Sequence, residues 1–165
     1  MTLVLSNKWC NIVVYRPPDT GLTQFQAVTQ FITNVIETNC DDSFRICLMG
    51  DLNFPNIDWG LLDIQNGFNR NINASAKEML TILSRYMMTQ HVNLPTRRRN
   101  ILDIFCTNDS FLVSNVVTSS TQISDHKIVS INLTSNSSHC FPPNKRYTPI
   151  GFESINFSKA DYKKI

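Results

Sequence analysis

The chain has 165 residues, of which 42% are apolar and 17% charged, with a formal net charge of +2. This is the composition of a soluble globular protein, and the length allows one domain with a real core. The longest apolar runs are only a few residues, which excludes a membrane-spanning helix. The N-terminus lacks the basic flank and length of a secretory signal peptide, so we expect an intracellular protein that is not secreted.

The five cysteines and the charge distribution narrow the class further. The cysteine count is odd and no Cys-x-x-Cys pair occurs, so a zinc site is not expected and a reducing compartment is favoured. Residues 141–165 carry five Lys/Arg and two acids, whereas residues 1–140 carry ten Lys/Arg and eleven acids. Residues 1–140 therefore have no overall excess of positive charge, and any contact between them and a nucleic acid should be local.

Two short strands are predicted near the N-terminus, over residues 3–5 and 11–15. Arg16-Pro17-Pro18 follows and ends strand pairing, because proline has no N–H to donate. Tyr15 lies at the strand end beside Arg16. It is placed either to contact a phosphate or simply to cap the core.

The next segment, residues 24–38, is predicted to be an amphipathic helix with Thr23 as its N-cap. A strand over residues 44–49 follows. Strand, helix, strand is the order of an α/β or α+β domain. The apolar stripe of the helix consists of Phe25, Val28, Phe31, Ile32, Val35 and Ile36.

An abrupt change from apolar to polar residues follows that strand, in Gly50-Asp51-Leu52-Asn53. Residues two apart at a strand end point the same way, so Asp51 and Asn53 can face one pocket. A carboxylate beside an amide can take a proton from water and bind a phosphate. The alternative is an ordinary turn, since Gly, Asp and Asn all favour turns.

The second half begins with an Asn-rich connection over residues 63–74 and a predicted helix over residues 75–90. Ser75 and Glu78 have the spacing of a capping box at the start of this helix. Its apolar stripe is interpreted as core.

Two short strands are predicted on either side of three consecutive arginines, Arg97, Arg98 and Arg99. Such a turn is either a solvated tip or, in a nuclease, a contact to DNA phosphates. Asp103 is predicted to lie inside the following apolar strand. A buried carboxylate needs a partner, which makes its position informative.

The last predicted strands cover residues 113–117 and 127–133, with Asp125-His126 between them. An Asp beside a His can supply a metal ligand and a phosphate contact or base. The composition then shifts to Ser, Asn and Pro. We therefore expect a domain over residues 1–134 and a linker with a basic tail over residues 135–165.

Four short motifs occur in a fixed order: Tyr-Arg-Pro-Pro at 15–18, Gly-Asp-Leu-Asn-Phe-Pro at 50–55, Ile-Leu-Asp-Ile-Phe at 101–105 and Ser-Asp-His at 124–126. This series resembles the endonuclease/exonuclease/phosphatase superfamily. The residues in and around these motifs are most similar to those of the apurinic-endonuclease-like domains of non-LTR (LINE-type) retrotransposons of the jockey and chicken-repeat groups. The resemblance implies an α/β fold, the C-terminal portion of a four-layer α/β/β/α sandwich.

The resemblance also implies an activity. These family members are metal-dependent phosphodiesterases whose parent elements nick DNA for target-primed reverse transcription. It therefore implies DNA as the substrate, Mg²⁺ or Mn²⁺ as the ion, and no small-molecule cofactor or membrane partner. It further implies a nuclear location and a reverse transcriptase region in the full-length element.

The family's catalytic roles carry over to five positions. Asp51 would orient or deprotonate the attacking water, with Asn53 helping to hold the phosphate and the water. His126 and Tyr15 would contact the scissile phosphate. Asp103 would hydrogen-bond His126 and fix its tautomer and orientation, which physical chemistry supports because an Asp behind a His raises its basicity.

The remaining predicted site residues would bind the metal and the DNA backbone. Asp125 would bind or organise the divalent metal ion. Arg16, together with Arg97, Arg98 and Arg99, would contact nucleic acid.

The sequence departs from the family at the principal metal ligand, a Glu that the family carries in its N-terminal half. No Glu precedes Glu37 here. We therefore expect a truncated domain in which metal binding is weakened or lost. Two alternatives follow: an inactive retroelement remnant with at most weak nucleic-acid or protein binding, or a phosphodiesterase acting on inositol phosphates or lipids, which the motif wording disfavours.

Overall fold

The computed structural model describes residues 1–6, 8–59 and 72–134. The predicted tail over 135–165 and residues 63–71 of the predicted connection over 63–74 lie outside these ranges. A five-stranded mixed sheet forms the centre of the fold. In spatial order its strands are β1 (Thr2–Ser6), β2 (Trp9–Val13), β3 (Arg45–Asp51), β5 (Asp103–Thr107) and β4 (Thr89–Gln90).

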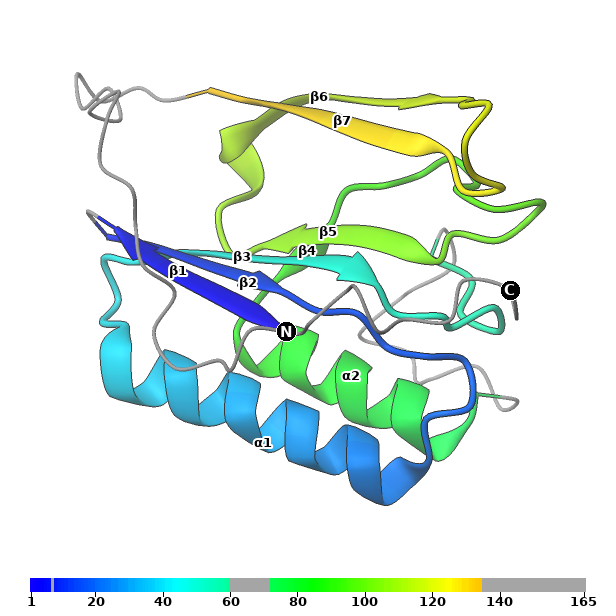
Figure 1. Cartoon of the computed structure of the whole chain (residues 1–165). Helices are drawn as coiled ribbons and strands as arrows, with labels where there is room; N and C mark the ends of the chain where they lie inside the picture. The colour runs from blue at the N-terminus through cyan, green and yellow to red at the C-terminus, as the bar shows by residue number, and fades with distance from the viewer. Residues whose placement is uncertain (7, 60–71, 135–165) are drawn as a thin grey trace, which may run out of the picture.

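Two helices cover one face of this sheet, and a β-hairpin lies over the other (Figure 1). The helices are α1 (Leu22–Asn39), which links the parallel strands β2 and β3, and α2 (Ala74–Arg85). The hairpin pairs β6 (Val113–Ser119) with β7 (Ile128–Leu133), after a short 3-10 turn, η1 (Ser110–Leu112). The predicted α/β class with stacked layers is confirmed.

A hydrophobic core fills each of the two layer interfaces. Beneath the helices, the α1 residues Phe25 and Ile32 are fully buried against the sheet. Above the sheet, Phe105 and Leu112 are buried, and Val129 packs against them from the hairpin. No helix in the described part of the chain is long and apolar enough to cross a membrane.

Helix α1 follows its predicted stripe but begins earlier than predicted. Phe25, Ile32 and other stripe positions are buried. The N-cap is Gly21 and not Thr23, and the backbone N–H of Gly21 donates to the side chain of Gln24 at 3.3 Å. The predicted cap was therefore two residues late.

Helix α2 is shorter than predicted at its C-terminus, and its cap differs. Asn73 is the N-cap, because its side chain accepts a hydrogen bond from Ala76 N at 2.8 Å, whereas Ser75 is buried in the first turn. The helix ends at Arg85. Met87 then adopts a left-handed conformation (φ 51°), and the chain turns into the edge strand β4. The prediction of helix as far as residue 90 was wrong.

The arginine turn and Asp103 also differ from prediction. Residues 97 and 100 form an isolated bridge, and no strand immediately precedes the turn in the described chain. Asp103 is the first residue of β5 rather than an interior one. Its side chain therefore lies at the sheet end, where it is half-buried.

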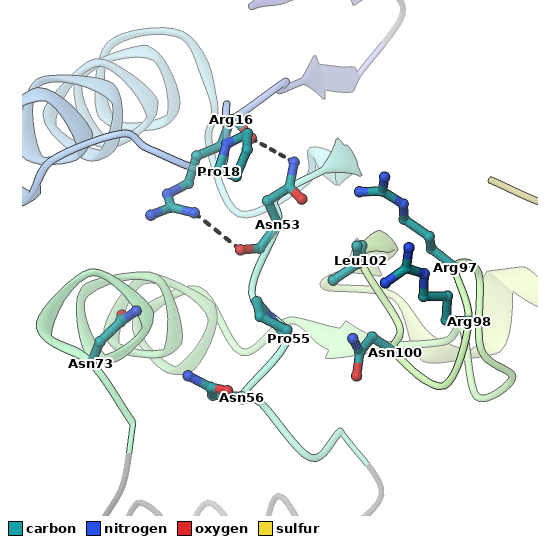
Figure 2. A pocket seen from close by; sticks show the side chains of 10 residues that line it. All are labelled: Arg16, Pro18, Asn53, Pro55, Asn56, Asn73, Arg97, Arg98, Asn100 and Leu102. Atoms are coloured by element: carbon teal, nitrogen blue, oxygen red, sulfur yellow. Dashed lines mark hydrogen bonds between the residues drawn. The ribbon is translucent and has the colours of Figure 1, made fainter. Parts of the chain in front are cut away.

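Gly50 permits two backbones to approach closely at that same end of the sheet. Val14 N donates to Met49 O and Arg16 N donates to Asp51 O, both at 2.8 Å, so the chain stays paired to β3 beyond β2. Gly50 has φ of +131°, and a Cβ there would lie 2.0 Å from the carbonyl oxygen of Val14. Only glycine suits this position. Figure 2 shows the polar contacts that then join Arg16 to Asn53.

We expect Gly50→Ala to lower the free energy of unfolding by about 3 kcal/mol, because the new methyl group meets backbone and the residue is held at positive φ. Denaturant unfolding measures this loss. Gly21→Ala is the matched control: a Cβ there meets nothing within 4 Å, so the cost should be about 1 kcal/mol from the weaker N-cap. Equal losses in the two variants would contradict the close-approach argument.

Candidate active site

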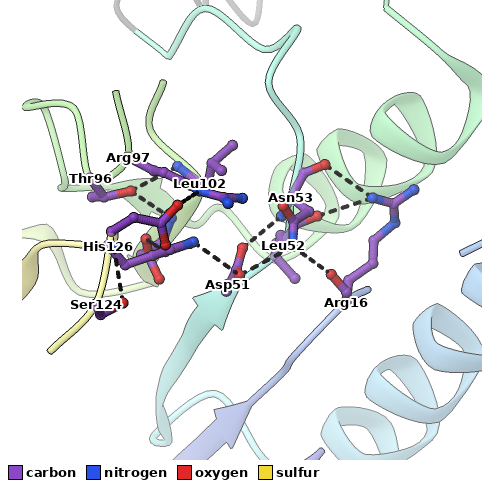
Figure 3. A network of polar contacts seen from close by, with 11 residues as sticks. Arg16, Asp51, Leu52, Asn53, Thr96, Arg97, Leu102, Ser124 and His126 are labelled. Atoms are coloured by element: carbon purple, nitrogen blue, oxygen red, sulfur yellow. Dashed lines mark hydrogen bonds and ion pairs between the residues drawn. The ribbon is translucent and has the colours of Figure 1, made fainter. Parts of the chain in front are cut away.

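Two aspartates and a histidine meet at the end of the central sheet. Asp51 ends β3 and Asp103 begins β5, directly opposite each other in the antiparallel register. His126 comes from the loop between β6 and β7. Its Nδ1 lies 2.8 Å from Asp103 Oδ2, and its Nε2 lies 3.9 Å from Asp51 Oδ2 (Figure 3). The imidazole is therefore held between the two carboxylates.

Asn53 fixes the carboxylate of Asp51. Its backbone N–H donates to Asp51 Oδ1 at 3.0 Å, and its side-chain Nδ2 donates to Asp51 Oδ2 at 3.1 Å and to Arg16 O at 3.0 Å. Asn53 has φ of 48°, a left-handed conformation that Asn tolerates better than most residues. The motif is thus both an Asx-type turn and part of the polar site, so its two interpretations do not exclude each other.

The environment of Asp51 disfavours its negative charge. Burial raises the pKa of Asp51, and the neighbouring charge of Asp103 raises it further. The hydrogen bond from Asn53 N and the nearby His126 and Arg97 act in the opposite direction. A cation placed between the two aspartates would relieve this repulsion.

A metal ion could use this same group as ligands. One ligand atom each of Asp51, Asp103 and His126 lies within 4.8 Å of the others. Carboxylate oxygens suit hard divalent cations, whereas an imidazole nitrogen suits transition metals better. Because Nδ1 of His126 already contacts Asp103, only its Nε2 could be a metal ligand. The two carboxylates are the better ligands for a hard cation.

Asp125, the predicted metal ligand, is not brought into this group. Its Oδ2 accepts a hydrogen bond from Arg97 Nε at 2.6 Å, and its side chain is 60% exposed. This contact lowers the pKa of Asp125. Asp125 is therefore next to His126 in the sequence, but its side chain forms an ion pair with Arg97 in the arginine turn.

Arg16 is buried rather than presented to solvent. It is 6% exposed, its guanidinium donates to the carbonyls of Leu52, Asn53 and Thr20, and it lies 4.5 Å above the ring of Phe54. In this arrangement it braces the loop after β3.

The other predicted DNA contacts are at the surface. Arg98 and Arg99 are exposed, and Arg97 is partly exposed. Tyr15 is 63% exposed, and within the described part of the chain no hydrogen bond or ion pair joins it to the Asp51–Asp103–His126 group.

Residues 9–130 match the model of a protein family described as endonuclease-reverse transcriptase. The chain belongs to this family. The sequence resemblance to retrotransposon endonucleases is therefore confirmed.

A solved structure with the same fold is the endonuclease domain of TRAS1, a telomere-specific non-LTR retrotransposon. The TM-score is 0.57 at 14% sequence identity, with 82% of this chain and 63% of that chain covered. The chain thus spans less than two thirds of the TRAS1 domain. No curated protein sequence matches the chain.

Thr96 supports this candidate site and was not singled out from the sequence. It is 0% exposed, and its hydroxyl accepts hydrogen bonds from the backbone N–H groups of Leu102 and Asp103 at 3.0 and 3.1 Å. Its carbonyl accepts one from Lys127 N at 2.7 Å. Thr96 therefore ties the start of β5 to the loop that carries His126. The only sequence signal was a Thr beside a turn, which is too common to single out.

We expect Thr96→Val to lower the free energy of unfolding by about 2–4 kcal/mol, because two N–H groups lose their acceptor. Denaturant unfolding gives the total, and amide hydrogen exchange at Leu102 and Asp103 locates it. Thr96→Ser keeps the hydroxyl and should cost only about 1 kcal/mol for the lost methyl group. If Val and Ser destabilise equally, the hydroxyl does not hold the start of β5.

Proposed function

We propose that this chain is a phosphodiesterase domain that nicks DNA with the help of a divalent metal ion, Mg²⁺ or Mn²⁺. The sequence led us to expect weakened metal binding, but Asp51 and Asp103 together offer an ion two carboxylates. The observation that carries the proposal is the imidazole of His126 held between Asp103 and Asp51, with the amide of Asn53 against the same carboxylate. A retrotransposon context, a nuclear location and a reverse transcriptase partner belong to the same proposal. The family description, endonuclease-reverse transcriptase, supports the nuclease activity and the reverse transcriptase partner.

Asp103 determines the orientation of His126 in this proposal. An ionised carboxylate only accepts hydrogen bonds, so Nδ1 of His126 carries the hydrogen at the 2.8 Å contact. Nε2 then faces Asp51 and the space in front of it. There it can take up a proton, and once protonated it can donate a hydrogen bond to a phosphate oxygen as charge develops in the transition state.

Asp51 and Asn53 serve the attacking water. The carboxylate of Asp51 can orient the attacking water by accepting its hydrogen bond, and it can take the proton of that water. The Asn53 amide holds that carboxylate in one orientation, so the acceptor oxygen is already in place. A bound divalent cation would be held by Asp51 and Asp103 and would neutralise charge on the phosphate.

A second candidate is a domain that binds nucleic acid without cutting it. The ion pair between Arg97 and Asp125 favours this reading, because it holds the predicted metal ligand away from the Asp51–Asp103–His126 group. In that case the basic turn would bind phosphates while the carboxylates hold no metal.

Nicking of supercoiled plasmid in Mg²⁺ tests the proposal. We expect the chain to convert supercoiled DNA to the open circle, and His126→Ala to be slower by a factor of about 10² or more, the range for a lost acid–base group. Asp103→Asn should reduce the rate as well, because it loosens His126. Chelation of the metal should abolish nicking.

Asp42→Asn is the matched control for these variants. Asp42 is an exposed acid on the α1–β3 loop, at the far end of β3 from the site. The variant should therefore nick plasmid at the rate of the unmodified chain. Folded protein that binds DNA but leaves the plasmid supercoiled would support the second candidate instead.

A further inference from the structure

A pocket of about 340 Å³ lies directly beside the candidate active site. Asn53 belongs to both, since its amide contacts Asp51 and its side chain also lines the pocket. Figure 2 shows the walls: the loop after β3 on one side, with Asn56, and the arginine turn on the other, with Arg98. The pocket is at the small end of the range for ligand sites, roughly 300–1,000 Å³.

The lining is cationic. Arg16, Arg97 and Arg98 all contribute to the wall, and none of the ten described lining residues carries a carboxylate. Arg16 is a fixed charge, because its guanidinium is buried and held by backbone carbonyls. Those carbonyls carry no formal charge, Arg16 Nε has no hydrogen-bond partner, and no described acid forms an ion pair with Arg16. Burial lowers the pKa of Arg16, and the nearby charge of Asp51 offsets this effect only in part. An anion in the adjoining space would therefore stabilise the guanidinium further.

Arg98 differs from the arginines on either side of it in sequence. Arg97 is already paired with Asp125, and Arg99 does not line the pocket. Arg98 is exposed, lines the pocket, and forms no ion pair with a described residue. Reciprocal hydrogen bonds between the backbones of Arg97 and Asn100, at 3.1 and 2.9 Å, close the turn and hold Arg98 at φ of 52°.

We propose that this pocket binds a backbone phosphate of the DNA strand, the one flanking the scissile phosphate, with Arg98 as its principal mobile ligand. Arg98 supplies the charge and the donors, and the amide of Asn56 across the pocket supplies a further donor. Arg16 contributes a fixed positive field from the wall. The inference rests on the proposed function, because the shared residue Asn53 is what makes this phosphate the neighbour of the scissile one.

DNA binding without cleavage tests the pocket separately from the chemistry. The full chain is titrated with a fluorescently labelled duplex in chelator, and anisotropy is measured over a series of salt concentrations and with several unrelated sequences. We expect Arg98→Ala to weaken binding about tenfold for every sequence and to reduce the slope of log K against log salt by about one. Arg98→Lys should restore the slope, since counterion release depends on the charge.

A double-mutant cycle separates the pocket from general basic charge. Arg98→Ala and Asn56→Ala should be strongly non-additive, because both side chains contact one phosphate. Arg99→Ala and Asn56→Ala should be additive, because Arg99 lies outside the pocket. Arg99 provides the same charge and the same turn as a matched control.

Three outcomes would overturn the inference. Equal slopes and additive effects for Arg98→Ala and Arg99→Ala would mean a diffuse basic surface instead of a pocket. A loss confined to one DNA sequence would mean base recognition in place of phosphate binding. If the unmodified chain shows no salt-dependent binding at all, the proposed function fails together with the pocket, whereas a failed cycle in a chain that binds and nicks DNA removes the pocket alone.

Discussion

The close approach of two backbones at Gly50 is the constraint on which the site depends. Because residue 50 is a glycine, Val14 O can occupy the space where a Cβ would lie. The chain after β2 can therefore stay paired to the end of β3. That pairing carries Arg16 to the loop after β3, where it accepts from Asn53 and donates to it. Asn53 in turn orients Asp51. A backbone contact at Gly50 thus sets the direction of the carboxylate of the next residue, Asp51.

The two carboxylates of the candidate site, Asp51 and Asp103, repel each other. Asp51 and Asp103 stand directly opposite in the ladder, an arrangement that is unfavourable for like charges. The His126 imidazole and the nearby Arg97 offset part of this repulsion, yet burial still keeps the pKa of Asp51 raised. Such a pair is stabilised further by whatever cation or proton enters. Ligand binding and folding stability should therefore be coupled here.

The sequence predicted the parts of this structure that depend on local periodicity. The stripe of α1 and the placement of Asp51 and Asn53 both follow from regular spacing along the chain. The predictions from sequence were wrong or incomplete where contacts between residues distant in the chain determine the structure. Met87 ends α2 in a left-handed conformation that usually belongs to glycine, because the chain must turn to pair β4 with β5. Thr96 was invisible because its two amide partners come from residues that only the folded turn brings near.

The arginines show most clearly why residue type alone did not give the roles. The sequence offered four equivalent cations for DNA, but the fold distinguishes them by what each already contacts. Arg16 is enclosed by carbonyls and an aromatic ring, and Arg97 is paired with Asp125. Both have therefore lost part of the freedom that a phosphate ligand needs, whereas Arg98 has not. Since Arg97 also lowers the pKa of Asp51, a strand bound across the turn would compete for its charge. DNA binding and the readiness of Asp51 are then linked through one side chain.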